Sequence, residues 1–108
     1  MFFLCKPSSA FGGGGVIVGG WKPIPDLTNP TVVSVGRFAV DEYNKEARTS
    51  LKFKKVVKGD QQVVEGMNYN LTIKAVVQGG AKKSYVAVVW DIPWERFRKL
   101  MSFKGPVV

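Results

Sequence analysis

The sequence predicts an α+β fold in which a single α-helix packs across a four- to five-stranded antiparallel β-sheet. Two observations carry this prediction. Apolar residues recur at helical spacing over residues 30–49, and apolar and polar residues alternate without a miss from Met67 to Val77. Further strand-like segments follow, separated by short turns, so sequential strands can pair as hairpins. A short strand around Gly20–Ile24 can add to an edge, and the helix can cover the concave face of the sheet.

Length and composition fit one folded domain with a tail. The chain has 108 residues, of which 45% are hydrophobic and 22% charged, enough to build a core. Residues 1–17 are predicted to form a flexible glycine-rich tail, because their serines and the Gly12–Gly15 run cannot bury enough surface to offset their ordering entropy. The domain is expected over residues 18–108. Met1–Cys5 are apolar but too few for a complete signal peptide, so they could be the remnant of a leader and the location stays open between secreted and cytoplasmic.

The helix has recognisable ends and one apolar face. Asn29 suits the N-cap and Pro30 the first helical position. The stripe consists of Val32, Val35, Ala39, Tyr43 and Ala47. Gly36 lies in the middle of the helix, where glycine costs about 1 kcal/mol relative to alanine, and close packing on the sheet would explain it. The helix is expected to end near Thr49 or Ser50.

The second half of the chain is predicted to be β. Leu51 and Phe53 alternate with lysines, and Val56-Val57 then interrupts the phase, which indicates a bulge. No segment is long and apolar enough to span a membrane, so no membrane partner is expected. The remaining elements are a strand at Met67–Val77, a turn at Gln78–Ala81, a strand at Tyr85–Trp90, a turn at Asp91–Trp94 and a last strand at Phe97–Phe103.

The residue inventory argues against an enzyme. Histidine is absent, which removes the usual general base and zinc ligand. The single cysteine, Cys5, allows neither an intrachain disulfide nor a cysteine-based metal site. The eight acidic residues show no spacing typical of a metal loop or a glycosidase pair. We therefore expect no catalytic residues, no metal and no cofactor.

The net charge of +8 leaves a second function class open. A basic β-sheet protein can bind single-stranded nucleic acid when aromatic residues on the sheet stack on bases, and the candidates here are Tyr69, Tyr85, Trp90 and Phe97. We favour the simpler interpretation that these aromatics are core residues beneath the helix and that the lysines are solvated, with no nucleic acid bound. The basic residues are spread from Lys45 to Lys104 rather than forming a dense run.

Three unusual segments are predicted to meet at one end of the sheet. Gln62–Gly66 is an apolar hairpin turn, and Pro93-Trp94 lies in another turn. Alternate turns of an antiparallel meander lie at the same end, and Gly19-Gly20 enters there if the first strand runs antiparallel to the next. Each segment also has an ordinary alternative. The valines of the first segment can be plain strand residues, Trp94 can fold back onto the core, and Gly19-Gly20 can be the end of the tail. Together they indicate an apolar binding edge.

These segments resemble the cystatins, and among them the plant cystatins. Gln62-Val63-Val64-Glu65-Gly66 matches the family's Gln-Xaa-Val-Xaa-Gly hairpin, Pro93-Trp94 its second hairpin and Gly19-Gly20 its N-terminal glycine region. Gly36–Asn44 is similar to the helix signature of the plant members, although Val35-Gly36 and Tyr43 depart from it. The resemblance covers residues 18–104.

The resemblance implies a reversible, tight-binding inhibitor of papain-like cysteine proteases that acts in plant defence. Such an inhibitor occludes the active-site cleft with the N-terminal segment and the two hairpins. The resemblance also implies a monomer, with a domain-swapped dimer as the alternative. A structural or taste-active protein on the same scaffold is a less favoured option. Because the chain ends at Val108, inhibition of legumain-type proteases is not expected. The implied protease-binding residues are Val18, Gly19, Gly20, Gln62, Val63, Val64, Glu65, Gly66, Pro93 and Trp94.

Overall fold

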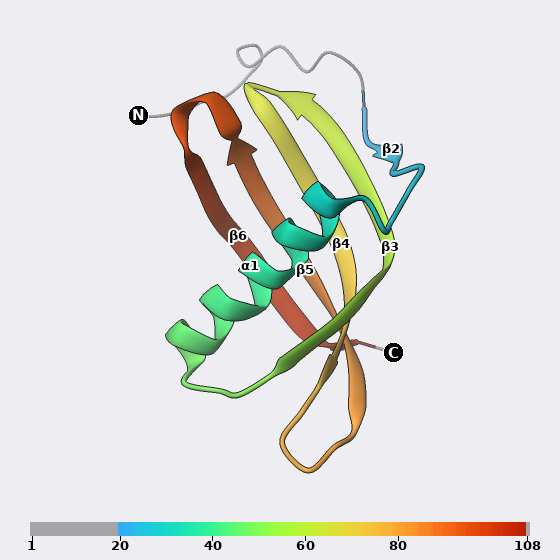
Figure 1. Cartoon of the computed structure of the whole chain (residues 1–108), viewed down its shortest axis with the longest axis vertical. Coiled ribbons are helices and arrows are strands. Elements are labelled where there is room, and N and C mark those ends of the chain that lie inside the picture. The colour runs from blue at the N-terminus through green and yellow to red at the C-terminus, as the bar shows by residue number, and fades with distance from the viewer. Residues whose placement is uncertain (1–19, 108) are drawn as a thin grey trace.

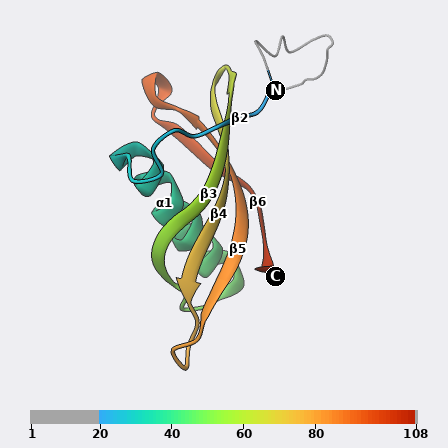
Figure 2. The same cartoon turned by 90° about the vertical axis from the view of Figure 1, so that its right-hand side faces the viewer.

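The structure, a computed structural model, describes residues 20–107, and these form one helix across a five-stranded antiparallel sheet (Figures 1 and 2). This confirms the predicted fold class. The predicted tail, residues 1–17, lies outside the described residues and stays a prediction. The strands are ordered β2-β3-β4-β5-β6 across the sheet. The bounds are Lys22–Pro23 (β2), Pro30–Ala47 (α1), Lys52–Val64 (β3), Gly66–Val76 (β4), Lys82–Ile92 (β5), Pro93–Glu95 (the 3₁₀ helix η2) and Phe97–Val107 (β6).

Side-chain hydrogen bonds fix both ends of α1. The Asn29 side chain accepts a hydrogen bond from the Thr31 backbone N–H at 2.9 Å, and Pro30 opens the helix as predicted. The helix ends at Ala47, two residues before Thr49, because Arg48 is in the left-handed conformation and donates its N–H to the Asn44 carbonyl. The Asn44 side chain then bonds both the N–H and the carbonyl of Leu51 and so ties the helix to the start of β3.

The buried face of α1 is shorter than the predicted stripe. Val35 and Ala39 are fully buried, but Ala47 is exposed, so the stripe ends one turn early. Gly36 allows a close approach to β3: a Cβ there would lie 2.8 Å from Phe53 Cε1. The expected reason for this glycine is therefore confirmed.

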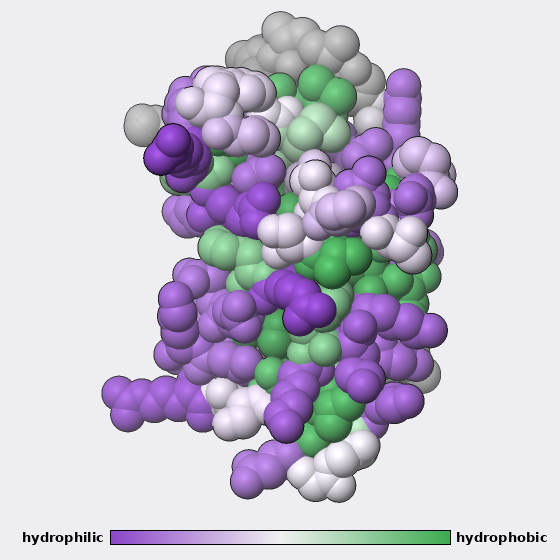
Figure 3. Space-filling view, in the orientation of Figure 1, coloured by the Kyte–Doolittle hydropathy of each residue, from purple (hydrophilic) through white to green (hydrophobic). Residues whose placement is uncertain are grey.

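The sheet places its apolar residues under the helix with the predicted period of two. Along β4, Tyr69, Leu71, Ile73 and Ala75 are buried and alternate with half-buried residues. The Val56-Val57 irregularity is confirmed by two register shifts in β3, between Phe53 and Lys55 and between Val56 and Lys58. The last strand runs to Val107, four residues beyond the prediction, and two register shifts along its pairing with β5 explain its mixed phase. On the helix side, hydrophilic residues cover much of the surface, with apolar patches between helix and strands (Figure 3).

Candidate functional site

The two predicted hairpins lie at the same end of the sheet (Figure 1). The β3–β4 hairpin closes where Val64 pairs with Gly66, and the β5–β6 hairpin closes through η2, where Ile92 pairs with Phe97. The β4–β5 turn lies at the opposite end of the molecule. We call the end that carries the two hairpins and Gly20 the hairpin edge.

The first hairpin is tighter than the sequence suggests. Val63 and Val64 are the last residues of β3, paired with Met67 and Gly66, so the turn itself is Glu65. The prediction of a two-valine turn is thus only partly right. Val63 is nevertheless 50% exposed, and Val64 is half-buried. Gln62, one of the predicted protease-binding residues, is 8% exposed and paired with Asn68.

Gly66 is required by both conformation and space. Its φ of +80° lies in the left-handed region that glycine adopts without strain. A Cβ at this position would collide with the Asp91 carbonyl oxygen and lie 3.0 Å from Ile92 Cγ1. The backbone of the first hairpin can therefore touch the end of β5 only because residue 66 lacks a side chain.

Trp90 links the turn of the first hairpin to the second. Its indole Nε1–H donates a hydrogen bond to the Glu65 carbonyl at 2.7 Å. Its ring meets the Phe97 ring edge to face, with 5.2 Å between centroids. Because Phe97 opens β6 directly after η2, one side chain contacts residues of both hairpins.

The second hairpin presents an exposed tryptophan. Trp94 is 69% exposed, so its side chain is not folded onto the core. Pro93 fixes the backbone before it, and the Arg96 N–H closes the turn by donating to the Pro93 carbonyl at 3.1 Å. The indole is thus an exposed apolar group on a backbone of limited freedom.

The N-terminal segment approaches the first hairpin from the other side. Lys22 pairs with Gln61 in an antiparallel register, and continuing this register brings Gly20 level with Val63. Gly20 is exposed, with open space around the position of a Cβ. Val18 and Gly19, the other predicted residues of this segment, lie outside the described residues. Trp21, next to Gly20, is 44% exposed.

A partly buried ion pair lies below the hairpin edge. Asp91 is 4% exposed, and its Oδ1 accepts a hydrogen bond from Arg98 Nε at 3.0 Å. The Arg98 Nη1 donates to Ser34 Oγ of α1 at 3.0 Å, so the pair joins the helix to β5 and β6. Burial raises the pKa of the Tyr69 hydroxyl, and the nearby Asp91 charge raises it further while Arg98 opposes this.

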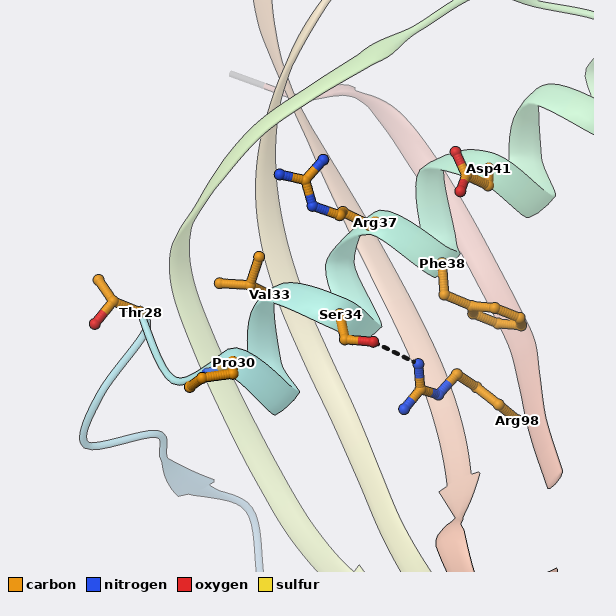
Figure 4. Close-up of a pocket in the computed structure, with 8 residues that line it drawn as sticks. All are labelled: Thr28, Pro30, Val33, Ser34, Arg37, Phe38, Asp41 and Arg98. Carbon is orange, nitrogen blue, oxygen red and sulfur yellow. Dashed lines mark hydrogen bonds between the residues drawn. The ribbon is translucent and has the colours of Figure 1, made fainter. Parts of the chain in front are cut away.

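The depressions along the helix do not form a reactive site. The one in Figure 4 lies between the first half of α1 and Arg98, which is already bonded to Ser34 and Asp91; Arg37 points away from Arg98. Over residues 20–107, no three His, Cys, Asp or Glu side chains are placed to hold a metal. The same residues include no helix long and apolar enough to cross a membrane.

Sequence reasoning missed Trp90 and Trp21 as members of the hairpin edge. It placed Tyr69, Tyr85, Trp90 and Phe97 together in the core. Tyr69 and Tyr85 are 6% and 5% exposed beneath the helix, but Trp90 and Phe97 are half-buried outside the core. A usable signal was present, because Trp90 occupies the outward phase of its strand, four residues before Trp94.

Solved structures share this architecture. A salivary cystatin from the soft tick Ornithodoros moubata superposes with a TM-score of 0.70 at 24% identity, over 82% of this chain and 97% of that one. Dimeric human cystatin F gives a TM-score of 0.69 at 19% identity, over 80% and 85% of the two chains. The fold is that of the cystatins.

Sequence relatives narrow the class. Cysteine proteinase inhibitor 5 of Arabidopsis thaliana is 53% identical over 81% of this chain and 71% of its own length. Cysteine proteinase inhibitor 1 of Actinidia chinensis is 48% identical over 82% and 76%. Residues 24–106 match a family model described as "Aspartic acid proteinase inhibitor". The chain belongs to this cystatin-like family of proteinase inhibitors, among the plant cysteine proteinase inhibitors or phytocystatins, and is not an enzyme.

Proposed function

We propose that the protein is a reversible, tight-binding inhibitor of papain-like cysteine proteases and that the hairpin edge is the surface that enters the protease cleft. The observation that carries this proposal is the placement of Val63, Trp94 and Gly20 at one end of the sheet, all of them exposed. Exposed apolar groups on a rigid scaffold are typical of binding surfaces.

Each part of the edge has a distinct role in the proposed complex. Val63 and Val64 cover the catalytic cysteine, and Trp94 packs on the primed side of the cleft. Gly20, with Val18 and Gly19 before it, runs along the unprimed subsites, where the absence of a side chain permits close backbone contact. Gln62, Glu65, Gly66 and Pro93 hold the two hairpins in shape.

Preorganisation supports tight binding without cleavage. The turn at Glu65 is held by Trp90 and by the close contact of Gly66 with Asp91, so little freedom remains to be lost on docking. A rigid hairpin also resists the distortion that would bring its peptide bond into attack geometry. We expect an interface of standard size, about 1,600 Å² in total.

Two classes of protease, cysteine and aspartic, have to be compared as targets. The two relatives described above are named for cysteine proteinases, whereas the family model is described for aspartic ones. We assign papain-like enzymes as the target because the relatives at 53% and 48% identity are named for cysteine proteinases and both hairpins carry the motifs by which the chain resembles the cystatins.

The experiment is a titration of active papain, with pepsin as the second target. Wild type should inhibit papain stoichiometrically and reversibly and leave pepsin active. Trp94→Ala should raise the inhibition constant roughly 30- to 150-fold, since burial of a large side chain contributes about 2–3 kcal/mol. Met101→Ala is the matched control, because Met101 is 51% exposed on β6 away from the edge. Equal effects of the two variants, or inhibition of pepsin alone, would refute the assignment.

A further inference from the structure

The sheet face opposite α1 carries a concentration of lysines that the proposed inhibition does not use. The views in Figures 1 and 2 show α1 on one side of the sheet and no described element on the other. The register places six lysines on this outer face, in the half of the sheet away from the hairpin edge. They are Lys52, Lys55 and Lys58 of β3, Lys74 of β4, Lys82 of β5 and Lys104 of β6, and we call them the lysine face.

Two bulges create this face. Lys52, Lys55 and Lys58 are three residues apart, a spacing that would alternate between the two sides of a regular strand. The register shifts after Phe53 and after Val56 each insert one extra residue. As a result the three lysines pair with Val76, Lys74 and Thr72, which alternate with the buried residues of β4 and therefore point outward.

Lys74 is the centre of the lysine face. It lies directly opposite Lys55, where Cβ atoms are roughly 4.5–5.5 Å apart, and diagonal to Lys58 and Lys82 at roughly 7–8 Å. Like charges in directly opposed positions destabilise a sheet. Edge protection explains Lys104 on β6 and the lysines at 52–58 of β3, where β2 does not pair, but Lys74 and Lys82 belong to interior strands. The opposed Lys55–Lys74 pair lowers the stability of the sheet at a position that edge protection does not explain, and this points to a function for the charge.

Little negative charge balances these lysines within the described chain. Of the acidic residues in the described strands, Asp60 alone has a register position on this face, and it lies toward the hairpin edge. The ion pairs among residues 20–107 join Lys45 to Glu42 and Arg98 to Asp91, and neither includes a lysine of this face.

We propose that the lysine face binds a linear acidic polysaccharide, a polymer that carries a carboxylate on each sugar. The lysines occupy three successive rows of the sheet, and their ammonium groups attract the repeated carboxylates of such a polymer as point charges. The hydroxyls of Thr72 and Ser84 have register positions between them and can bond sugar hydroxyls. This half of the face carries no aromatic residue in the described strands to stack bases, which single-stranded nucleic acids require.

The lysine face and the hairpin edge lie at different ends of the sheet, so both can be occupied at once. Lys82 follows the β4–β5 turn, whereas Val63 and Trp94 belong to the hairpins at the other end. A polysaccharide bound at the lysine face would retain the inhibitor on a polymer matrix while its edge stays free.

The test measures binding of the full chain to polygalacturonate, to a 20-nucleotide single-stranded DNA and to phosphatidylserine vesicles at 50 and 200 mM salt. We expect binding to polygalacturonate that weakens about 10-fold or more between the two salt concentrations, because condensed counterions are released. A variant with Lys55→Gln and Lys74→Gln should bind at least 5-fold more weakly and still inhibit papain as wild type does.

The matched control carries Arg37→Gln and Lys45→Gln, two exposed positions on α1, and has the same net charge. It should bind polygalacturonate nearly as wild type does. Equal losses of polygalacturonate affinity in the two variants would show that binding depends only on net charge, and would overturn the proposal. Absence of binding at 50 mM salt, or tighter binding to the DNA or the vesicles, would also overturn it. The binding measurements that would overturn the proposal do not depend on papain inhibition, so they can fail independently of the proposed function.

Discussion

The indole N–H of Trp90 donates a hydrogen bond to the carbonyl oxygen of Glu65 across 2.7 Å, from the outward side of β5 to the turn of the first hairpin. The two residues are 25 positions apart in sequence, and the bond fixes the hairpin turn relative to the strand that leads to Trp94. Together with the close contact of Gly66 with Asp91, this bond holds the two hairpins in a fixed relative position.

Trp90→Phe should loosen the first hairpin without unfolding the protein. Phenylalanine retains the ring contact with Phe97 but cannot donate to Glu65. A hydrogen bond of this kind contributes roughly 0.5–1.5 kcal/mol, so the inhibition constant for papain should rise about 2- to 12-fold. Hydrogen exchange at Gly66 should accelerate while exchange in β4 stays slow. Unchanged exchange at the hairpin would show that the bond does not order it.

Gly66→Ala should destabilise the protein more than Gly80→Ala. Both glycines have positive φ, +80° and +94°, so both variants incur backbone strain of roughly 1–3 kcal/mol. Only residue 66 also meets a neighbour, the Asp91 carbonyl, whereas a Cβ at residue 80 has open space. The measurement is the free energy of unfolding of each variant in urea. The difference between the two variants gives the cost of the Asp91 contact, because the backbone strain is common to both. Equal losses of unfolding free energy would mean that the Asp91 contact is unimportant.

Stability should fall at alkaline pH through Tyr69. Burial, reinforced by Asp91, raises its folded-state pKa above the ordinary value of 10.0. The unfolded chain then releases its proton first, so the unfolding free energy falls as pH rises from about 10 toward the folded pKa. Burial also raises the pKa of Tyr85, which acts in the same direction. Tyr69→Phe should flatten the decline measured between pH 9 and 11, and an unchanged slope would exclude Tyr69 as its source.

Lys74→Glu should stabilise the protein at low ionic strength. The change converts a like-charge pair with Lys55 into an opposite-charge pair, and such cross-strand terms are roughly 0.2–1 kcal/mol each. The midpoint of thermal unfolding should rise by roughly 1–5 °C in 10 mM salt and by less in 0.5 M salt. Lys99→Glu, opposite Trp90, is the control and should change the midpoint less. A lower midpoint for Lys74→Glu would contradict the register.

Much of the fold could be predicted because its signals are local. The alternation along β4 and the Asn29-Pro30 helix start need no tertiary information, and the adjacency of the hairpins follows from chain order in a meander. The end of α1 at Ala47 could not be predicted, because it depends on the left-handed conformation of Arg48 and on the bonds from the Asn44 side chain to Leu51, seven residues away.

The parts that were missed depend on register. Trp90 looked like a core aromatic until the pairing with Asn68 placed it on the outer side, within reach of Glu65. The β3 lysines looked scattered, since their spacing of three matches no strand period. Two bulges bring them onto one face, and the exact position of a bulge is not encoded in local propensity.

In the proposed complex the exposed valine of the first hairpin, Val63, enters the protease cleft. Val63→Asp and Val57→Asp test it most directly, because both valines are exposed on β3, at 50% and 37%, and only Val63 lies at the hairpin edge. The measurement is the inhibition constant of each variant for active papain. We expect the inhibition constant to rise at least about 100-fold for Val63→Asp, which places an unpaired charge in the interface, and to change less than about 3-fold for Val57→Asp. Equal inhibition constants for the two variants would contradict it.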